Sequence, residues 1–218
     1  MKVQWLGHSA FLISSKSGAR IVTDPYQPGG YDGAIRHAPF NQPADVITIS
    51  HDHPDHAYPR MVSGRPIIIK GAGRYVAAGI EFLGVQCAHD ETGGSERGKN
   101  TIFTFTVDEI RVCHLGDLGH ILNADQAAEI GSVDVMLIPV GGHFTIGPDE
   151  AWRVADQLAA KIVIPMHFKT EKIDFPIAGV DDFLKDKPNV KMQHSSTIEL
   201  AKQDLPIERE IVVLTPAL

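Results

Sequence analysis

The chain has 218 residues, of which 43% are hydrophobic and 22% are charged. This composition excludes disordered and fibrous proteins, and the length permits a sizeable core. The formal net charge is −7 and the basic residues are scattered rather than clustered, which argues against a protein that binds along a nucleic-acid backbone.

Short β-branched runs that end in turn or polar residues predict strands along the whole chain. Several of these runs are continuously apolar, which is typical of strands buried on both faces. In chain order the predicted strands cover residues 2–6, 10–14, 19–25, 45–50, 65–70, 81–87, 101–107, 109–115, 133–139, 161–165 and 210–216. The sequence therefore predicts a strand-rich α/β protein.

Helices are fewer, and three are expected in the second half of the chain. Asn123 and Gln126 form a capping-box pattern ahead of the first one. Pro148 opens the second, whose apolar stripe we expect to pack against a sheet. The third should end near Pro188. The expected helices cover residues 124–130, 149–160 and 180–187.

No linker divides the chain, so we expect a single domain over residues 1–218. The Gly- and Pro-rich segment 24–45 lies between two predicted strands and is interpreted as one long surface loop. Gly7 interrupts the N-terminal apolar stretch, and no run approaches the roughly 18 apolar residues of a membrane span. A cytoplasmic location is expected, with Cys87 and Cys113 as free thiols.

The segment "SHDHPDH", residues 50–56, places three histidines and two aspartates directly after the apolar run "VITI". In an extended segment residues two apart point the same way, so His51 and His53 can present their imidazoles to one cation. A turn at Pro54 would let Asp55 and His56 face a neighbouring position. These four side chains can therefore begin two adjacent metal sites, and the alternative is a solvated polar loop without a ligand role.

Two metal sites need more ligands than this loop holds, and the chain provides them after other strands. His89, Asp117 and His167 each follow an apolar run that is far away in the sequence. Ligands that a fold gathers at one sheet edge are expected in such positions.

These motifs resemble the metallo-β-lactamase-fold superfamily of metal-dependent hydrolases over essentially the whole chain. The resemblance rests on "GHSAFLI", "TDP", "SHDHPDH", "AHDETGG", "HLGDLGH", "IPVGGHFTIG" and "IPMHF". Within the superfamily the chain is similar to the compact branch of ascorbate-6-phosphate lactonase-like and N-acylphosphatidylethanolamine phospholipase D-like proteins. The resemblance implies a four-layer αβ/βα sandwich with two mixed β-sheets and a dinuclear metal site at their shared edge.

Carried over residue by residue, the resemblance assigns His51, His53 and His89 to a first metal and Asp55, His56 and His167 to a second, with Asp117 bridging both. The implied cofactors are two divalent ions, with zinc as the first expectation and manganese, iron or nickel as alternatives. His114 competes with His89 for one position. We prefer His89 because it lies just beyond a strand end, whereas His114 falls inside a strand and out of phase with Asp117.

Further residues near the motifs are candidates for supporting roles. The resemblance implies that His8 lines the site or contacts substrate, which makes it a catalytic candidate together with Asp55. Asp24 resembles the family aspartate that supports the metal loop by hydrogen bonds. His120 and His143 are candidates for proton transfer or substrate binding, with surface or packing roles as the alternative.

The expected function is hydrolysis of a small ester, lactone or phosphodiester by a hydroxide that the two metals activate and Asp55 orients. The expected partner is a small-molecule substrate rather than a nucleic acid. Arg97, Lys99 and Lys169 are candidates for binding a phosphate or carboxylate, and exposed solvated charges are the alternative. A non-catalytic metal-binding protein and a β-lactam or thioester hydrolase are the competing functions. The oligomeric state stays open, with a homo-oligomer among the options.

Overall fold

A computed structural model describes all residues from Met1 to Leu218 and contains two mixed β-sheets. The smaller sheet has the strand order β13-β1-β2-β3-β4-β5. Its strands are β1 (Lys2–Gly7), β2 (Ala10–Ser14), β3 (Arg20–Thr23), β4 (Val46–Ile49), β5 (Ile67–Lys70) and β13 (Thr197–Glu199). The pairs β3–β4 and β4–β5 are parallel, and the pairs β13–β1, β1–β2 and β2–β3 are antiparallel.

The larger sheet has the strand order β12-β14-β11-β10-β9-β8-β7-β6. Its strands are β6 (Gly73–Ala77), β7 (Ile80–Ala88), β8 (Lys99–Val107), β9 (Ile110–His114), β10 (Val135–Pro139), β11 (Ile162–Met166), β12 (Val190–Met192) and β14 (Glu210–Val213). The half from β6 to β9 is antiparallel, and the half from β9 to β12 is parallel.

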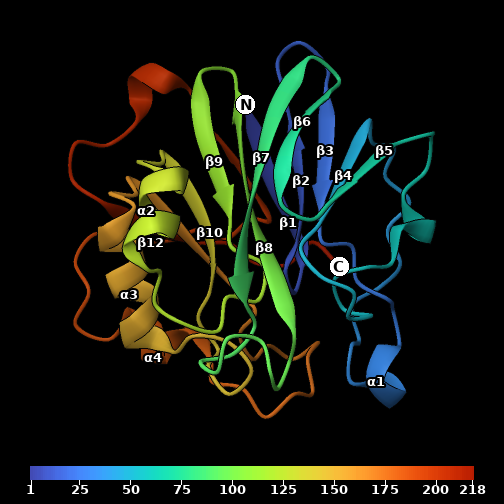
Figure 1. The fold of residues 1–218 in the computed structure, drawn as a ribbon. Helices are drawn as coiled ribbons and strands as arrows, with labels where there is room; N and C mark the ends of the chain where they lie inside the picture. The colour runs from blue at the N-terminus through green and yellow to red at the C-terminus, as the bar shows by residue number, and fades with distance from the viewer.

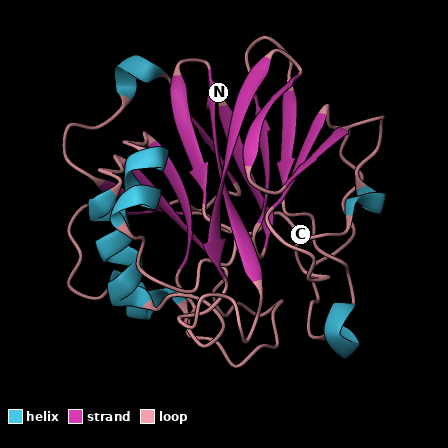
Figure 2. Cartoon of the chain, viewed as in Figure 1, coloured by secondary structure: helices cyan, strands magenta, loops and turns pink.

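Short helices flank the two sheets (Figures 1 and 2). Helix α2 packs on β7, α3 packs on β10 and α4 packs on α3, whereas α1 lies on the opposite side of the molecule (Figure 1). The helices are α1 (Gly30–Gly33), α2 (Ala124–Ile130), α3 (Pro148–Gln157) and α4 (Val180–Leu184), with 3₁₀ turns at Pro59–Met61 and Lys202–Asp204. The predicted sandwich of two mixed sheets is confirmed.

Every strand predicted from the sequence is present, but three short strands escaped prediction. These are β6, β12 and β13, which have five, three and three residues. Their side chains are mostly exposed or half-buried, so they lack the apolar run that marks the other strands. Helix α2 has the predicted bounds, whereas α3 and α4 end earlier than predicted, at Gln157 and Leu184.

The core has two parts, which lie on opposite faces of the smaller sheet. The larger part holds 46 buried residues and joins the inner faces of both sheets to α3, through residues such as Phe11, Phe103 and Val154. The smaller part holds 13 buried residues, among them Tyr26 and Phe40 of the long loop 24–45. This loop, rather than long helices, therefore covers the outer face of the smaller sheet.

The direction of the strands determines where the polar motifs meet. Strands β1, β3 and β4 run the same way in the smaller sheet, and β7, β9 and β11 run the same way in the larger one. His8, Asp24, the loop 50–56, His89, Asp117 and His167 follow the C-terminal ends of these six strands. One edge of the sandwich thus collects all of them.

None of the helices is long and apolar enough to span a lipid bilayer.

Asp108 joins the two sheets at the opposite edge of the sandwich. It lies in the two-residue turn between β8 and β9, where its φ is 50°. Its carboxylate accepts hydrogen bonds from the Ser15 hydroxyl at 2.7 Å and the Lys16 N–H at 2.9 Å, and the Met1 amino group lies 3.0 Å away. Partial burial raises its pKa, but these donors outweigh burial and lower the pKa to about 2.

We expect Asp108→Asn to lower the free energy of unfolding at neutral pH, and we expect this loss to vanish in acid. The folded-state pKa lies below the ordinary value of about 3.9, so the ionised carboxylate stabilises the fold above that value. Its contribution is lost as the pH falls towards about 2. Asparagine tolerates a positive φ, so the backbone of the turn is preserved. Urea unfolding at a series of pH values measures the difference, with exposed Asp182→Asn as the control. A pH-independent difference would contradict this assignment.

Candidate metal centre

Backbone hydrogen bonds hold the loop 50–56 in place. At its start the Ser50 carbonyl accepts the Thr101 N–H at 3.0 Å. The His53 carbonyl accepts the N–H groups of His56 and Ala57, at 3.0 and 2.9 Å, which closes the expected turn around Pro54. The Pro54 carbonyl accepts the Gln27 N–H at 2.9 Å and so ties the turn to the long loop 24–45. The polar segment is therefore an ordered part of the sheet edge.

The histidines and aspartates of the six loops form two adjacent groups. The potential ligand atoms of His51, His53 and His89 lie within 4.8 Å of one another. Those of His8, Asp55, His56 and His167 also lie within 4.8 Å of one another. All of these side chains are buried except His53, which is half-buried.

Asp117 lies between the two groups. Its Oδ2 is 3.2 Å from His89 Nε2 and 3.3 Å from His167 Nε2, and its Oδ1 is 3.1 Å from His56 Nε2. One carboxylate thus contacts imidazoles from both groups, which is the position required of a bridging ligand.

The donor atoms of this cluster fit divalent metal ions. His56 Nε2 and Asp117 Oδ1 are buried and neither makes a hydrogen bond, although they lie 3.1 Å apart. Leaving a buried polar atom without a partner costs about 1–3 kcal/mol. A cation bound by the imidazole nitrogens and carboxylate oxygens would satisfy both atoms, and such ligands suit zinc and other transition metals.

The electrostatics of the cluster favour neutral imidazoles at His8 and His51 but a positive charge at His56, beside the two carboxylates. Burial lowers the pKa of His51 to about 3 and is the main reason why the pKa of His8 falls to about 4. Burial alone would raise the pKa of Asp117, but His167 and His56 hold it well below its usual range. Burial would lower the pKa of His56, yet Asp117 and Asp55 hold it well above its usual range. Positive charge is therefore favoured between the two carboxylates.

Asp24 orients two of the histidines from behind. Its Oδ2 accepts the His56 Nδ1–H at 2.8 Å, which leaves His56 Nε2 facing the cluster. The same oxygen accepts the Ser50 hydroxyl at 2.5 Å, and Asp24 Oδ1 accepts the Ser50 N–H at 2.8 Å. The Ser50 Oγ in turn lies 2.9 Å from His51 Nδ1. Asp24 thus contacts His56 directly and His51 through Ser50, and its supporting role stays a prediction.

Three residues of the site have a left-handed backbone, although none is glycine. The φ values are 51° at His8, 40° at Asp24 and 51° at His167. Such conformations cost of order 1 kcal/mol or more each and persist only where the surroundings hold them, which is common at functional sites. They turn each side chain from its strand end towards the cluster.

The other candidate histidines lie outside the cluster. Both ring nitrogens of His114 are occupied, because Nε2 bonds the Ser9 carbonyl at 2.9 Å and Nδ1 accepts the Gly116 N–H at 3.1 Å. His120 is likewise bound to backbone, through the Ala88 N–H and the Ile121 carbonyl. His143 is exposed and lines a small cavity that Arg97 and Phe144 also border. The structure thus brings His89, rather than His114, to Asp117.

A cavity of about 460 Å³, here called the cluster pocket, opens above the cluster. Its walls include three aromatic residues, Tyr31, Phe144 and Phe175, which the sequence did not mark as site residues. The Tyr31 ring packs against Phe175 with centroids 5.3 Å apart, and its hydroxyl donates to Asp55 Oδ1 at 3.0 Å. The one signal available in the sequence was that all three lie in glycine- or proline-rich loops next to the motifs.

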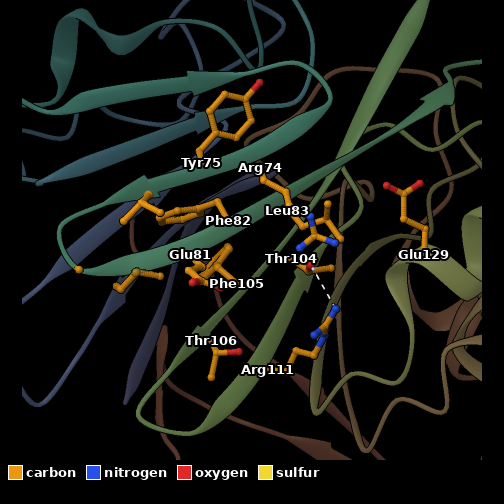
Figure 3. Close-up of a pocket in the computed structure, with 13 residues that line it drawn as sticks. Arg74, Tyr75, Glu81, Phe82, Leu83, Thr104, Phe105, Thr106, Arg111 and Glu129 are labelled. Atoms are coloured by element: carbon orange, nitrogen blue, oxygen red, sulfur yellow. Dashed lines mark hydrogen bonds between the residues drawn. The ribbon is translucent and has the colours of Figure 1, made fainter.

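A larger cavity, of about 630 Å³, lies elsewhere, on strands β6 to β8 (Figure 3). Arg74, Arg111 and Glu129 are among the residues that line it, and Arg111 contacts Thr104. No residue of the histidine and aspartate cluster borders this cavity. The candidate functional site is therefore the cluster pocket.

The sandwich and its edge cluster define a protein of the metallohydrolase class. Residues 2–167 match the family described as the β-lactamase superfamily domain. The chain therefore belongs to the metallo-β-lactamase superfamily, and the resemblance to this superfamily that was read from the sequence is confirmed.

Individual relatives agree with this assignment. A UPF0173 metal-dependent hydrolase of Korarchaeum cryptofilum is 30% identical over 99% of this chain and 97% of the relative. Another, from Pyrococcus horikoshii, is 29% identical over 78% of this chain and 85% of the relative. A solved structure from Thermotoga maritima, of a protein of the metallo-β-lactamase superfamily, is 42% identical with a TM-score of 0.80. It covers 98% of this chain and 97% of its own. The chain is thus related to metal-dependent hydrolases along its whole length.

We expect Asp24→Asn to weaken metal binding by about 10–100-fold, because His56 and Ser50 lose the carboxylate that orients them. Titration of metal-free protein with zinc against a chromophoric chelator measures the dissociation constants. Asp45→Asn is the matched control, since Asp45 also accepts a backbone N–H, from Arg20 at 2.8 Å, but lies outside the cluster. Equal affinities in a folded Asp24→Asn variant and the wild type would contradict the supporting role.

Proposed function

We propose that the protein is a hydrolase that uses two bound divalent metal ions, zinc first among them, to cleave a small ester, lactone or phosphodiester. The observation that carries the proposal is the position of Asp117, whose carboxylate contacts His89 of one group and His56 and His167 of the other. We assign His51, His53 and His89 to one ion and Asp55, His56 and His167 to the second, with Asp117 shared.

The residues around the cluster pocket support water as the nucleophile. No serine, threonine, cysteine or lysine lines the pocket, so a covalent route through these side chains has no candidate there. Metal ions in such a site supply Lewis acidity and lower the pKa of water so that a nucleophile exists at neutral pH. The protein then has to position that water and the scissile group.

Asp55 is the residue we assign to positioning the attacking water. Its carboxylate is held from two sides, by the Tyr31 hydroxyl at 3.0 Å from Oδ1 and by His8 Nε2 at 3.1 Å from Oδ2. This fixed orientation is what a residue needs in order to direct a water and accept its proton. In this scheme His8 acts by holding Asp55 in its orientation.

The aromatic walls support a substrate with an apolar part. Phe144 and Phe175 lie with ring centroids 6.0 Å apart, and the ring of Tyr31 lies 5.3 Å from that of Phe175. Binding an acyl, aryl or lactone group against these rings removes apolar surface from water and excludes water from the reacting bond. A pocket of about 460 Å³ suits a small molecule.

We expect Asp117→Ala to lose most of its bound metal and Asp55→Asn to retain at least one equivalent while hydrolysis falls by about 10²-fold or more. The first variant removes the shared carboxylate, whereas the second keeps the first group intact. Metal analysis of protein purified without added metal is combined with a panel of lactone, ester, phosphodiester, thioester and β-lactam substrates. Asp182→Asn, on the exposed side of α4, is the control.

Two outcomes would contradict this assignment. Full metal content in Asp117→Ala would show that Asp117 is not a metal ligand. Two equivalents of metal in the wild type without hydrolysis of any substrate class, and no change of turnover in Asp55→Asn, would favour the non-catalytic metal-binding alternative.

A further inference from the structure

Another cavity, of about 490 Å³, adjoins the loop of the metal cluster and is here called the basic groove. Three cationic side chains line it, and they come from the end of β5, the loop before β8 and the start of β8. These are Lys70, Arg97 and Lys99. Asp52 is the only acidic residue in the lining, and it forms an ion pair with Lys70. The groove is therefore a local region of positive charge on a chain whose net charge is −7.

The basic groove and the cluster pocket share two side chains. His53 and Arg97 line both cavities, and His51 of the first histidine group also borders the groove. A molecule that reaches the cluster through the pocket can therefore extend past His53 into the groove. The two cavities differ in chemistry, because the pocket has three aromatic walls whereas Ala72 is the only apolar side chain of the groove.

Arg97 is held at the boundary by the loop that follows His89. The buried Asp90 carboxylate accepts the N–H groups of Thr92, Gly94, Glu96 and Arg97 at 2.7–3.0 Å. This arrangement fixes the backbone of the loop between a candidate metal ligand and Arg97. The Arg97 guanidinium also lies 5.8 Å from the centre of the Phe144 ring, a favourable contact for a cation.

Arg97 keeps donors free for a ligand. The one carboxylate within 4.0 Å of its guanidinium is that of Glu96, at 3.7 Å from Nη1, and the side chains of Arg97 and Glu96 are 34% and 58% exposed. Exposed pairs of this kind contribute little, whereas a guanidinium has five N–H donors in a fixed plane. A phosphate or carboxylate that enters the groove can therefore be bound by Arg97 with two parallel hydrogen bonds and by the ammonium groups of Lys70 and Lys99.

We propose that the basic groove binds an anionic group of the substrate, a carboxylate or a phosphate, at a distance from the bond that is cleaved. This inference rests on the proposed function and narrows it. The substrate is a small ester, lactone or phosphodiester whose apolar part lies against Tyr31, Phe144 and Phe175 and whose anionic end reaches Arg97 and Lys99.

The test compares ligands that differ only in the second anionic group. Isothermal titration of the zinc-loaded protein uses valerate, which has one carboxylate, glutarate, which has two, and 4-phosphonobutyrate, which replaces the second carboxylate by a phosphonate. One carboxylate of each ligand can bind at the cluster. The ratio of the dissociation constants for valerate and glutarate, or for valerate and 4-phosphonobutyrate, reports the contribution of the groove.

We expect the wild type to bind at least one dianion about tenfold or more tightly than valerate, since hydrogen bonds to charged groups contribute that much. The larger of the two ratios identifies carboxylate or phosphate as the preferred group. In the double variant Arg97→Gln/Lys99→Gln both ratios of dissociation constants should fall close to one. The control Arg153→Gln/Lys185→Gln makes the same change of net charge at exposed positions on and near α3 and α4, and it should keep the wild-type ratio.

A ratio near one in the wild type, an unchanged ratio in Arg97→Gln/Lys99→Gln, or an equal loss in the control would overturn the inference. Calorimetry needs no turnover, so the outcome is separate from that of the proposed function. If the dianion preference depends on Arg97 and Lys99 but no ester, lactone or phosphodiester is hydrolysed, the groove is an anion site and the hydrolase proposal fails. If hydrolysis occurs without the preference, the hydrolase proposal stands and the groove has no part in binding.

Discussion

The buried carboxylate of Asp117 imposes the constraint on which the site depends. It is 2% exposed and has imidazole nitrogens of His56, His89 and His167 within 3.3 Å. A carboxylate removed from water must be compensated by positive charge or by hydrogen bonds, because its desolvation costs several kcal/mol or more. In this cluster the compensation is a proton on the imidazoles or a bound cation. Metal binding and the stability of this sheet edge are therefore coupled.

Two glycines allow the segment around Asp117 to pack closely against neighbouring loops. A Cβ atom at Gly116 would overlap Ser50 and Asn100, and one at Gly119 would overlap the backbone of His89 and Asp90. The Asp117 segment can thus lie directly against both the loop of the smaller sheet and the loop after β7 only because glycine stands on each side of it. The loops at the shared edge of the two sheets therefore pack closely around the Asp117 carboxylate.

Much of this architecture could be predicted from the sequence, and the exceptions have physical reasons. The spacing of His51, His53, Asp55 and His56 marked the metal loop because short-range geometry limits what four such residues can do. The strand β13 and the aromatic walls depend on contacts between segments that are far apart in the sequence. The strand β6 forms a hairpin with its neighbour β7, and it was missed, like β12, because it lacks an apolar run. Tyr31 meets Phe175 because Ile35 and Ile173 form an isolated β-bridge, and no local pattern records that pairing.

The origin of each group of residues explains why the chemistry is easier to infer than the substrate. Every proposed metal ligand follows a strand end or lies in the loop 50–56, so the sheets fix its position. Apart from the candidate ligands and the loop 50–56, the walls of the cluster pocket and of the basic groove come mainly from the loops 24–45, 90–98, 142–147 and 170–178 and from the ends of β5 and β8. Loops can change length and side chains without disturbing the strands. Relatives that share the ligands can therefore differ in substrate. The aromatic rings and Arg97 lie in these loops, where a change of side chain alters what the pocket can bind without altering the ligands.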